Sequence, residues 1–188
     1  MKSLNIFSIF VAVLLTVAVT NFQLRHDIWT SQDYALYKLE KRTLEILPYQ
    51  LNAGFNPQTE TLWVTNARLQ LAAKRLHVKF GTTPLVPGLA GSVEYMTRTV
   101  SIDPKFKNDT RCMVLAHELA HLFQPKSLEA YGEEEMFAEG VAYLVVRQER
   151  DDVDMFATYL VKHKNYLMVL RTYRKEIKFA AQTILGEQ

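Results

Sequence analysis

Apolar and polar residues follow one another along this chain in patterns that predict mostly helices. Apolar positions recur every three or four residues over 31–47, where Pro48 ends the pattern, and again over 60–76. The second half of the chain repeats this spacing in four further segments, at 110–123, 133–147, 151–164 and 165–185. We therefore expect two helices in the first part of the domain and four in the second.

Between these two groups of helices the spacing changes to that of short strands. Residues 77–80 predict a strand that ends at Gly81. Residues 92–96 and 99–102 alternate around a tight turn near Thr97 and Arg98, as in a hairpin. Helices and a small sheet in separate parts of the chain indicate an α+β fold.

The N-terminus differs from the rest of the chain. Lys2 precedes a run, residues 4–19, that is almost entirely apolar. A positive start followed by such a run is typical of a secretory signal or signal anchor, which we place at 1–20, with Thr16-Val17-Ala18 as a passable cleavage site. We expect 21–30 to be a connector and 31–188 a single domain. The chain would then be periplasmic, secreted or held by a membrane segment over 4–20.

Composition narrows the choice of function without deciding it. The chain has 188 residues, a formal net charge of +2 and one cysteine, Cys112, so it can form no internal disulfide. A charge this mild does not favour a nucleic-acid partner. The basic residues of the last segment are expected to form a solvated helix face, and they are Arg171, Arg174, Lys175 and Lys178.

The chemistry of the chain centres on His117-Glu118-Leu119-Ala120-His121. If 110–123 is helical, the two histidines lie one turn apart on one face and can bind a single zinc ion. Glu118 projects beside them, where it can take a proton from a water molecule on the metal. This spacing predicts a zinc site with Glu118 as the general base.

A catalytic zinc ion usually takes three protein ligands, so a further ligand is expected downstream. The segment 133–147 begins with acidic residues, and Glu133 and Glu134 suit the N-terminal end of a helix dipole. Glu135 and Glu139 lie one turn apart on one face. One of them could bind the metal while the other orients a histidine, and spacing alone does not choose between them.

The two motifs together resemble the signature helices of gluzincin metallopeptidases. Glu135, Ala138 and Glu139 match the Glu-x-x-Ala-Asn/Asp pattern of the ImmA/IrrE type, which implies Glu135 as ligand and Glu139 as the residue that orients a histidine. A rival register is similar to the Glu-Gly-x-Ala of aminopeptidase-like gluzincins, in which Glu139 would be the ligand. The resemblance favours Glu135.

The likeness extends to other parts of the chain. The segment 88–102 resembles the edge hairpin that precedes the active helix in such zincins, and the stretch from Glu134 to Leu185 is similar to the zincin domain of ArdC-type antirestriction proteins. The resemblance implies zinc-dependent hydrolysis of peptide bonds by metal-activated water, with an extended peptide or protein substrate beside the hairpin.

Two other functions remain open at this point. The chain could be a zinc-binding module without efficient turnover, or a DNA-associated antirestriction-like protein. The apolar N-terminus and the lack of room for a DNA-binding domain speak against the latter. Three residues are candidates to donate a hydrogen bond to an oxyanion by residue type only, and they are Tyr131, Tyr143 and His163. We assign no role to His26 and His77. The sequence does not distinguish an endopeptidase from an exopeptidase and does not indicate the oligomeric state.

Overall fold

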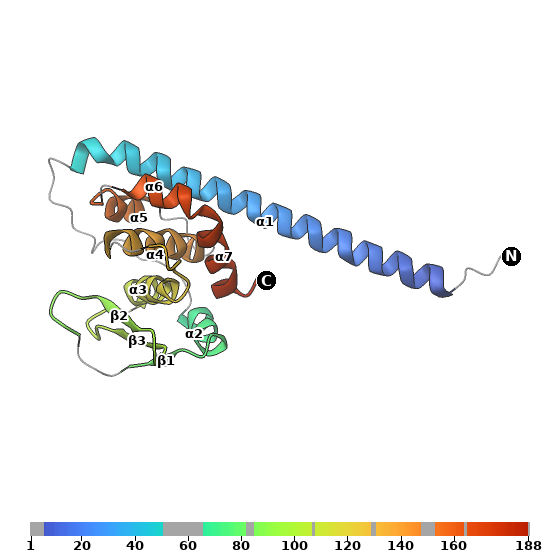
Figure 1. Cartoon of the computed structure of the whole chain (residues 1–188), viewed down its shortest axis with the longest axis horizontal. Helices are drawn as coiled ribbons and strands as arrows, with labels where there is room; N and C mark the ends of the chain where they lie inside the picture. Colours follow the sequence, from blue (N-terminus) through green and yellow to red (C-terminus); the bar gives the residue numbers. More distant parts are fainter. Residues whose placement is uncertain are drawn as a thin grey trace. The chain divides into compact units, whose positions relative to one another are not determined.

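The computed structural model describes residues 6–50, 66–81, 85–106, 108–128, 131–147, 153–163 and 165–187. Within these residues it contains seven helices and one three-stranded sheet, which confirms the α+β class (Figure 1). The chain divides into two compact units, residues 1–35 and 36–188. The second unit holds the sheet and all residues of the two sequence motifs.

Helix α1 spans Ile6–Gln50 and passes from the first unit into the second. Residues 21–30, expected to be a connector, are helical, and they contain neither glycine nor proline to interrupt the helix. The expected end of this helix at Leu47 is wrong, because the helix continues through Pro48 for three more residues, to Gln50. Within the part of the chain that the structure describes, no helix is both long enough and apolar enough to cross a membrane.

The sheet contains β1 (Lys79–Phe80), β2 (Gly91–Glu94) and β3 (Thr99–Ile102) in the order β1-β3-β2. β2 pairs antiparallel with β3, with Val93 opposite Val100, whereas β1 pairs parallel with β3. The predicted hairpin is therefore confirmed, and β2 lies at an edge of the sheet. Its turn begins two residues earlier than expected, because β2 ends at Glu94 and not at Met96, and Arg98 within the turn takes a positive φ of 52°.

The other helices follow the predicted order with shifted ends. Six helices come after α1, and they are α2 (Asn66–Arg75), α3 (Asn108–His121), α4 (Tyr131–Val146), α5 (Val153–Leu160), α6 (Tyr166–Thr172) and α7 (Arg174–Leu185). Residues 60–65 of the second predicted helix lie outside the described residues. The helix predicted over 165–185 is wrong as a single element, because it is divided at Tyr173, where φ is −102° and ψ is 23°.

Helix α4 forms the centre of the second unit. Its residues 136–146 are all buried, which agrees with a sequence that is apolar on every side. α3 lies between α4 and the hairpin, and α5, α6 and α7 also pack against α4 (Figure 1). Gly140 allows a close approach, because a Cβ there would lie 2.9 Å from Leu170 and 3.3 Å from Ile177.

One buried carboxylate ties α1 to the last two helices. Glu40 is 6% exposed, and its two oxygens accept hydrogen bonds from Arg171 Nε at 3.1 Å and Arg174 Nη1 at 3.0 Å. We call these three residues the Glu40 cluster. Lys178 is also buried, at 4% exposure. The expectation that these basic residues form a solvated face is therefore wrong for Arg174 and Lys178, and Arg171 is exposed but paired.

Candidate metal centre

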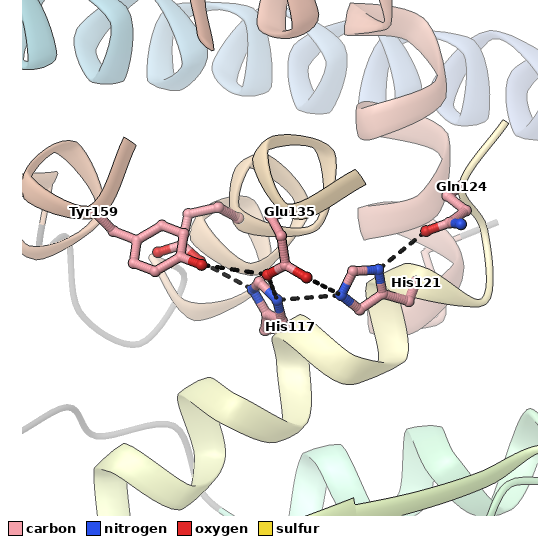
Figure 2. Close-up of polar contacts among 6 residues, drawn as sticks. His117, His121, Gln124, Glu135 and Tyr159 are labelled. Carbon is pink, nitrogen blue, oxygen red and sulfur yellow. Dashed lines mark hydrogen bonds and ion pairs between the residues drawn. The ribbon is translucent and has the colours of Figure 1, made fainter. Parts of the chain in front are cut away.

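The two sequence motifs meet because α3 and α4 pack side by side. α3 carries His117 and His121 on one face, and α4 presents Glu135 to both of them (Figure 2). The Nε2 atoms of the two histidines lie 3.2 Å apart. Carboxylate oxygens of Glu135 lie 3.0 Å from Nε2 of His117 and 3.6 Å from Nε2 of His121. Ligand atoms of these three residues therefore converge on one point.

These distances can be compared with those around a bound ion. Two nitrogens that each lie 2.0–2.1 Å from a tetrahedral zinc ion are about 3.3 Å apart, and a carboxylate oxygen in the same shell is at a similar separation. The three observed separations, 3.2, 3.0 and 3.6 Å, lie close to that value. The residues His117, His121 and Glu135 could thus hold a metal ion without large movement.

The outer nitrogen of each histidine faces an acceptor. Nδ1 of His117 lies 3.0 Å from Glu139 Oε2, and Nδ1 of His121 lies 3.0 Å from Gln124 Oε1. A neutral imidazole that donates from Nδ1 has only a lone pair at Nε2. Both lone pairs then point at each other and at Glu135, so the centre is electron-rich and requires a positive charge.

Without a metal ion, that charge is a proton on His117. Burial alone would lower the pKa of His117, but the hydrogen bonds and charges of Glu135 and Glu139 outweigh burial and raise the pKa to about 10. Burial and the positive charge of His117 lower the pKa of His121. Burial would raise the pKa of Glu135, but the hydrogen bond and charge of His117, the charge of His121 and the hydrogen bond from Tyr159 together outweigh burial and lower the pKa. The centre therefore favours one positive charge, on His117, beside the carboxylates of Glu135 and Glu139.

Glu118 lies beside the three residues without hydrogen bonding to them. Burial raises the pKa of Glu118 to about 7, against the opposing effect of the positive charge of His117 and with a smaller contribution from the negative charge of Glu135. The start of β2 lies directly against its carboxylate, because a Cβ at Gly91 would be 2.5 Å from Glu118 Oε1. A side chain at position 91 would require the Glu118 carboxylate to move, so glycine there lets the carboxylate lie against the edge strand of the sheet.

The structure adds two residues that sequence reasoning missed. The hydroxyl of Tyr159, on α5, donates to Glu135 Oε2 at 3.3 Å, and its ring lies edge-on to His117 (Figure 2). Gln124 follows the end of α3 and accepts the proton of His121. Gln124 lies three residues after His121, a spacing that could have identified it as a partner. No local signal marks Tyr159.

The other candidates lie in different surroundings. Tyr143 is fully buried and packs edge-on against Phe156. The ring of His163 lies 5.3 Å from that of Tyr159, and the side chain of Tyr131 lies outside the described residues. His26 belongs to the first unit and His77 ends the turn after α2.

In comparisons with known proteins, no family model, curated protein or solved structure matches this chain.

Proposed function

We propose that this chain is a gluzincin-like zinc metallopeptidase that hydrolyses peptide bonds. The observation that carries the proposal is the convergence of His117 Nε2, His121 Nε2 and a Glu135 oxygen beside the buried carboxylate of Glu118. Two imidazoles and one carboxylate leave one position of a tetrahedral zinc ion open, as in catalytic sites. A zinc ion so bound would lower the pKa of water and polarise a carbonyl group.

The residues around the metal position have distinct roles in this proposal. His117, His121 and Glu135 bind the ion, and Glu139 and Gln124 hold the two imidazoles with Nε2 facing it. Glu118 accepts a proton from the attacking water and passes it to the leaving amine. A base whose pKa is near 7 can do both at neutral pH.

The edge strand offers a place for the substrate. β2 is paired with β3 on one side only, so its other side can bind an extended peptide through main-chain hydrogen bonds. Because Gly91 touches the Glu118 carboxylate, a peptide paired with β2 would pass close to the general base. This arrangement supports an extended peptide or protein substrate.

The substitution Glu118→Gln tests the proposal. It removes the base but none of the metal ligands, so zinc content should stay at the wild-type level while hydrolysis of a protein substrate falls roughly 10²–10⁴-fold. Glu176→Gln makes the same change on an exposed position of α7 and should alter neither quantity. Hydrolysis by Glu118→Gln at the wild-type rate would contradict the proposal. Zinc uptake by a wild-type protein that hydrolyses no peptide would instead favour a zinc-binding module without turnover.

We also propose that the N-terminal segment directs export of the chain. In the first unit, α1 exposes large apolar side chains, with Val13, Leu15 and Val19 at 54%, 61% and 58% exposure. Such side chains are unfavourable in water and favour an apolar environment. Fractionation of the cells that make the protein, with sequencing of its N-terminus, tests this. An intact N-terminus in the cytoplasmic fraction would contradict export and would favour the DNA-associated alternative.

A further inference from the structure

We propose that Arg98 is a positioning residue for the substrate, because it attaches the hairpin to α2 and so holds the edge strand β2 beside Glu118. The inference rests on the proposed function, since it requires a peptide to bind along β2. Arg98 is the last residue of the hairpin turn, directly before β3. Its guanidinium group donates two hydrogen bonds to the carbonyl oxygen of Leu76, from Nε at 3.2 Å and from Nη2 at 2.9 Å.

Leu76 is a fixed support because it directly follows the end of α2. Carbonyl groups at the end of a helix lack partners within the helix and lie at the negative end of its dipole, so a guanidinium group is a favourable partner. α2 is itself anchored in the second unit, where Leu69, Ala72 and Ala73 are buried. The side chain of Arg98 therefore connects the hairpin to a helix whose place is set by core packing.

The main chain of Arg98 contacts the segment that follows α2. Lys79 N, in β1, donates to the carbonyl oxygen of Arg98 at 2.9 Å. β1 contains only two residues, so its pairing with β3 is a short attachment for the hairpin. The two hydrogen bonds from the guanidinium group add a second attachment at the same end. Arg98 thus holds the turn end of the hairpin through both its main chain and its side chain.

The hairpin that Arg98 holds carries the groups with which a peptide would pair. Asp103 N donates to the carbonyl oxygen of Ala90 at 2.9 Å, so these residues form a hydrogen-bonded pair. Such pairs recur at every second residue of an antiparallel ladder, and the main-chain groups of Gly91 and Val93, which lie between them, face the open side of β2. Gly91 also lies against Glu118. A hairpin that shifted would therefore move the partners of the peptide relative to the general base.

The substitution Arg98→Asn tests the inference. Asparagine tolerates the left-handed backbone of position 98, where φ is 52°, but it lacks the guanidinium group. The hairpin should then occupy its position for a smaller fraction of the time, so KM for casein should rise about 3–10-fold. A bound peptide restores the position, so kcat should change by less than about twofold. Arg98→Lys keeps one donor and should give a smaller rise in KM.

Arg75→Asn provides the matched control. Arg75 Nη2 donates to the carbonyl oxygens of Thr183 at 2.9 Å and Ile184 at 2.6 Å, near the end of α7. The control thus removes the same kind of contact, from an arginine to the end of a helix, away from the hairpin. Both variants should lower the midpoint of urea unfolding, but only Arg98→Asn should raise KM. Zinc affinity should stay at the wild-type value in both, because the three ligands lie on α3 and α4.

Hydrogen exchange provides a measurement that requires no hydrolysis. The amide hydrogens of residues 91–102 should exchange faster in Arg98→Asn than in the wild type, and at the wild-type rate in Arg75→Asn. Wild-type exchange or a wild-type KM in Arg98→Asn, or an equal rise in KM in both variants, would overturn the inference alone. Wild-type protein that takes up no zinc or hydrolyses no casein would overturn the proposed function, and with it the role of the hairpin in substrate binding.

Discussion

Two clusters in this molecule, each built around a buried or partly buried carboxylate, differ in where the balancing positive charge comes from. In the Glu40 cluster, one carboxylate accepts hydrogen bonds from two guanidinium groups, at 3.1 and 3.0 Å. Positive and negative partners are both supplied by the chain. In the metal centre, two imidazole nitrogens and a carboxylate face one another, and the positive charge must come from a proton on His117 or from a bound cation.

This difference indicates which of the two groups is the better candidate to bind a ligand. A buried charge that is fully paired within the chain contributes to the fold and to the specificity of helix packing. A buried group whose lone pairs point at one another is costly to form and is retained where something binds there. The Glu40 cluster therefore holds α1 against α6 and α7, whereas the metal centre on α3 and α4 is the candidate for chemistry.

The largest expected effect is that of Glu135→Gln on metal content. Removing a ligand should abolish stoichiometric zinc uptake, because an amide oxygen is a far weaker ligand than a carboxylate. Glu139→Gln keeps all three ligands and removes the acceptor of His117 Nδ1–H, so zinc affinity should fall roughly 10–100-fold. Metal analysis of the two purified variants measures both. Loss of the metal from Glu139→Gln alone would make Glu139 the third ligand.

The substitution Glu40→Gln applies the same chemical change to the other cluster. It leaves Arg171 and Arg174 without their carboxylate, and because Arg171 is largely exposed we expect the free energy of unfolding to fall by roughly 1–3 kcal/mol. Urea unfolding of the metal-free protein measures the loss. Zinc affinity of the folded protein should be unchanged, and a large loss of zinc would contradict the separation of the two clusters.

The charge of the metal centre predicts how zinc binding depends on pH. Since the pKa of metal-free His117 is raised to about 10, His117 carries a proton at neutral pH that the ion must displace. Zinc affinity should therefore rise about tenfold per pH unit between about pH 6.5 and 8, and about one proton should be released per ion. Calorimetric titration in buffers of different ionisation enthalpy counts that proton. Affinity independent of pH in this range would show that His117 is already neutral.

The smallest effect is expected for Tyr159→Phe. Its hydroxyl donates to a Glu135 oxygen at 3.3 Å, a long bond to a partly buried carboxylate. Loss of this hydrogen bond should weaken zinc binding by a few-fold, because a long hydrogen bond to a metal ligand contributes about 1 kcal/mol. Chelator competition measures the change. Tyr166→Phe is the control, because it removes a buried hydroxyl that has no hydrogen-bond partner among the described residues. A loss above about 100-fold would indicate that Tyr159 itself binds the ion.

Much of the candidate site could be predicted from the spacing of residues along the sequence. His117 and His121 lie one turn apart in any helix, and so do Glu135 and Glu139, so their shared faces follow from helix geometry alone. The hairpin was also predictable, because residues 92–102 alternate around a turn. The continuous helix α1 was harder to predict. Residues 21–30 were expected to be a connector between an export segment and the domain, whereas the structure continues the helix through them.

The sequence by itself determined which residues share a helix face and which segments form strands, because both depend on periods of a few residues. Only the tertiary structure decided that Glu135 faces the Nε2 atoms while Glu139 faces the other side of His117, since this depends on how α3 and α4 are turned against each other. The same packing brought in Tyr159, Gln124 and the Gly91 contact. Spatial neighbours from different elements leave no local pattern in the chain, because their contact arises only when the whole core packs.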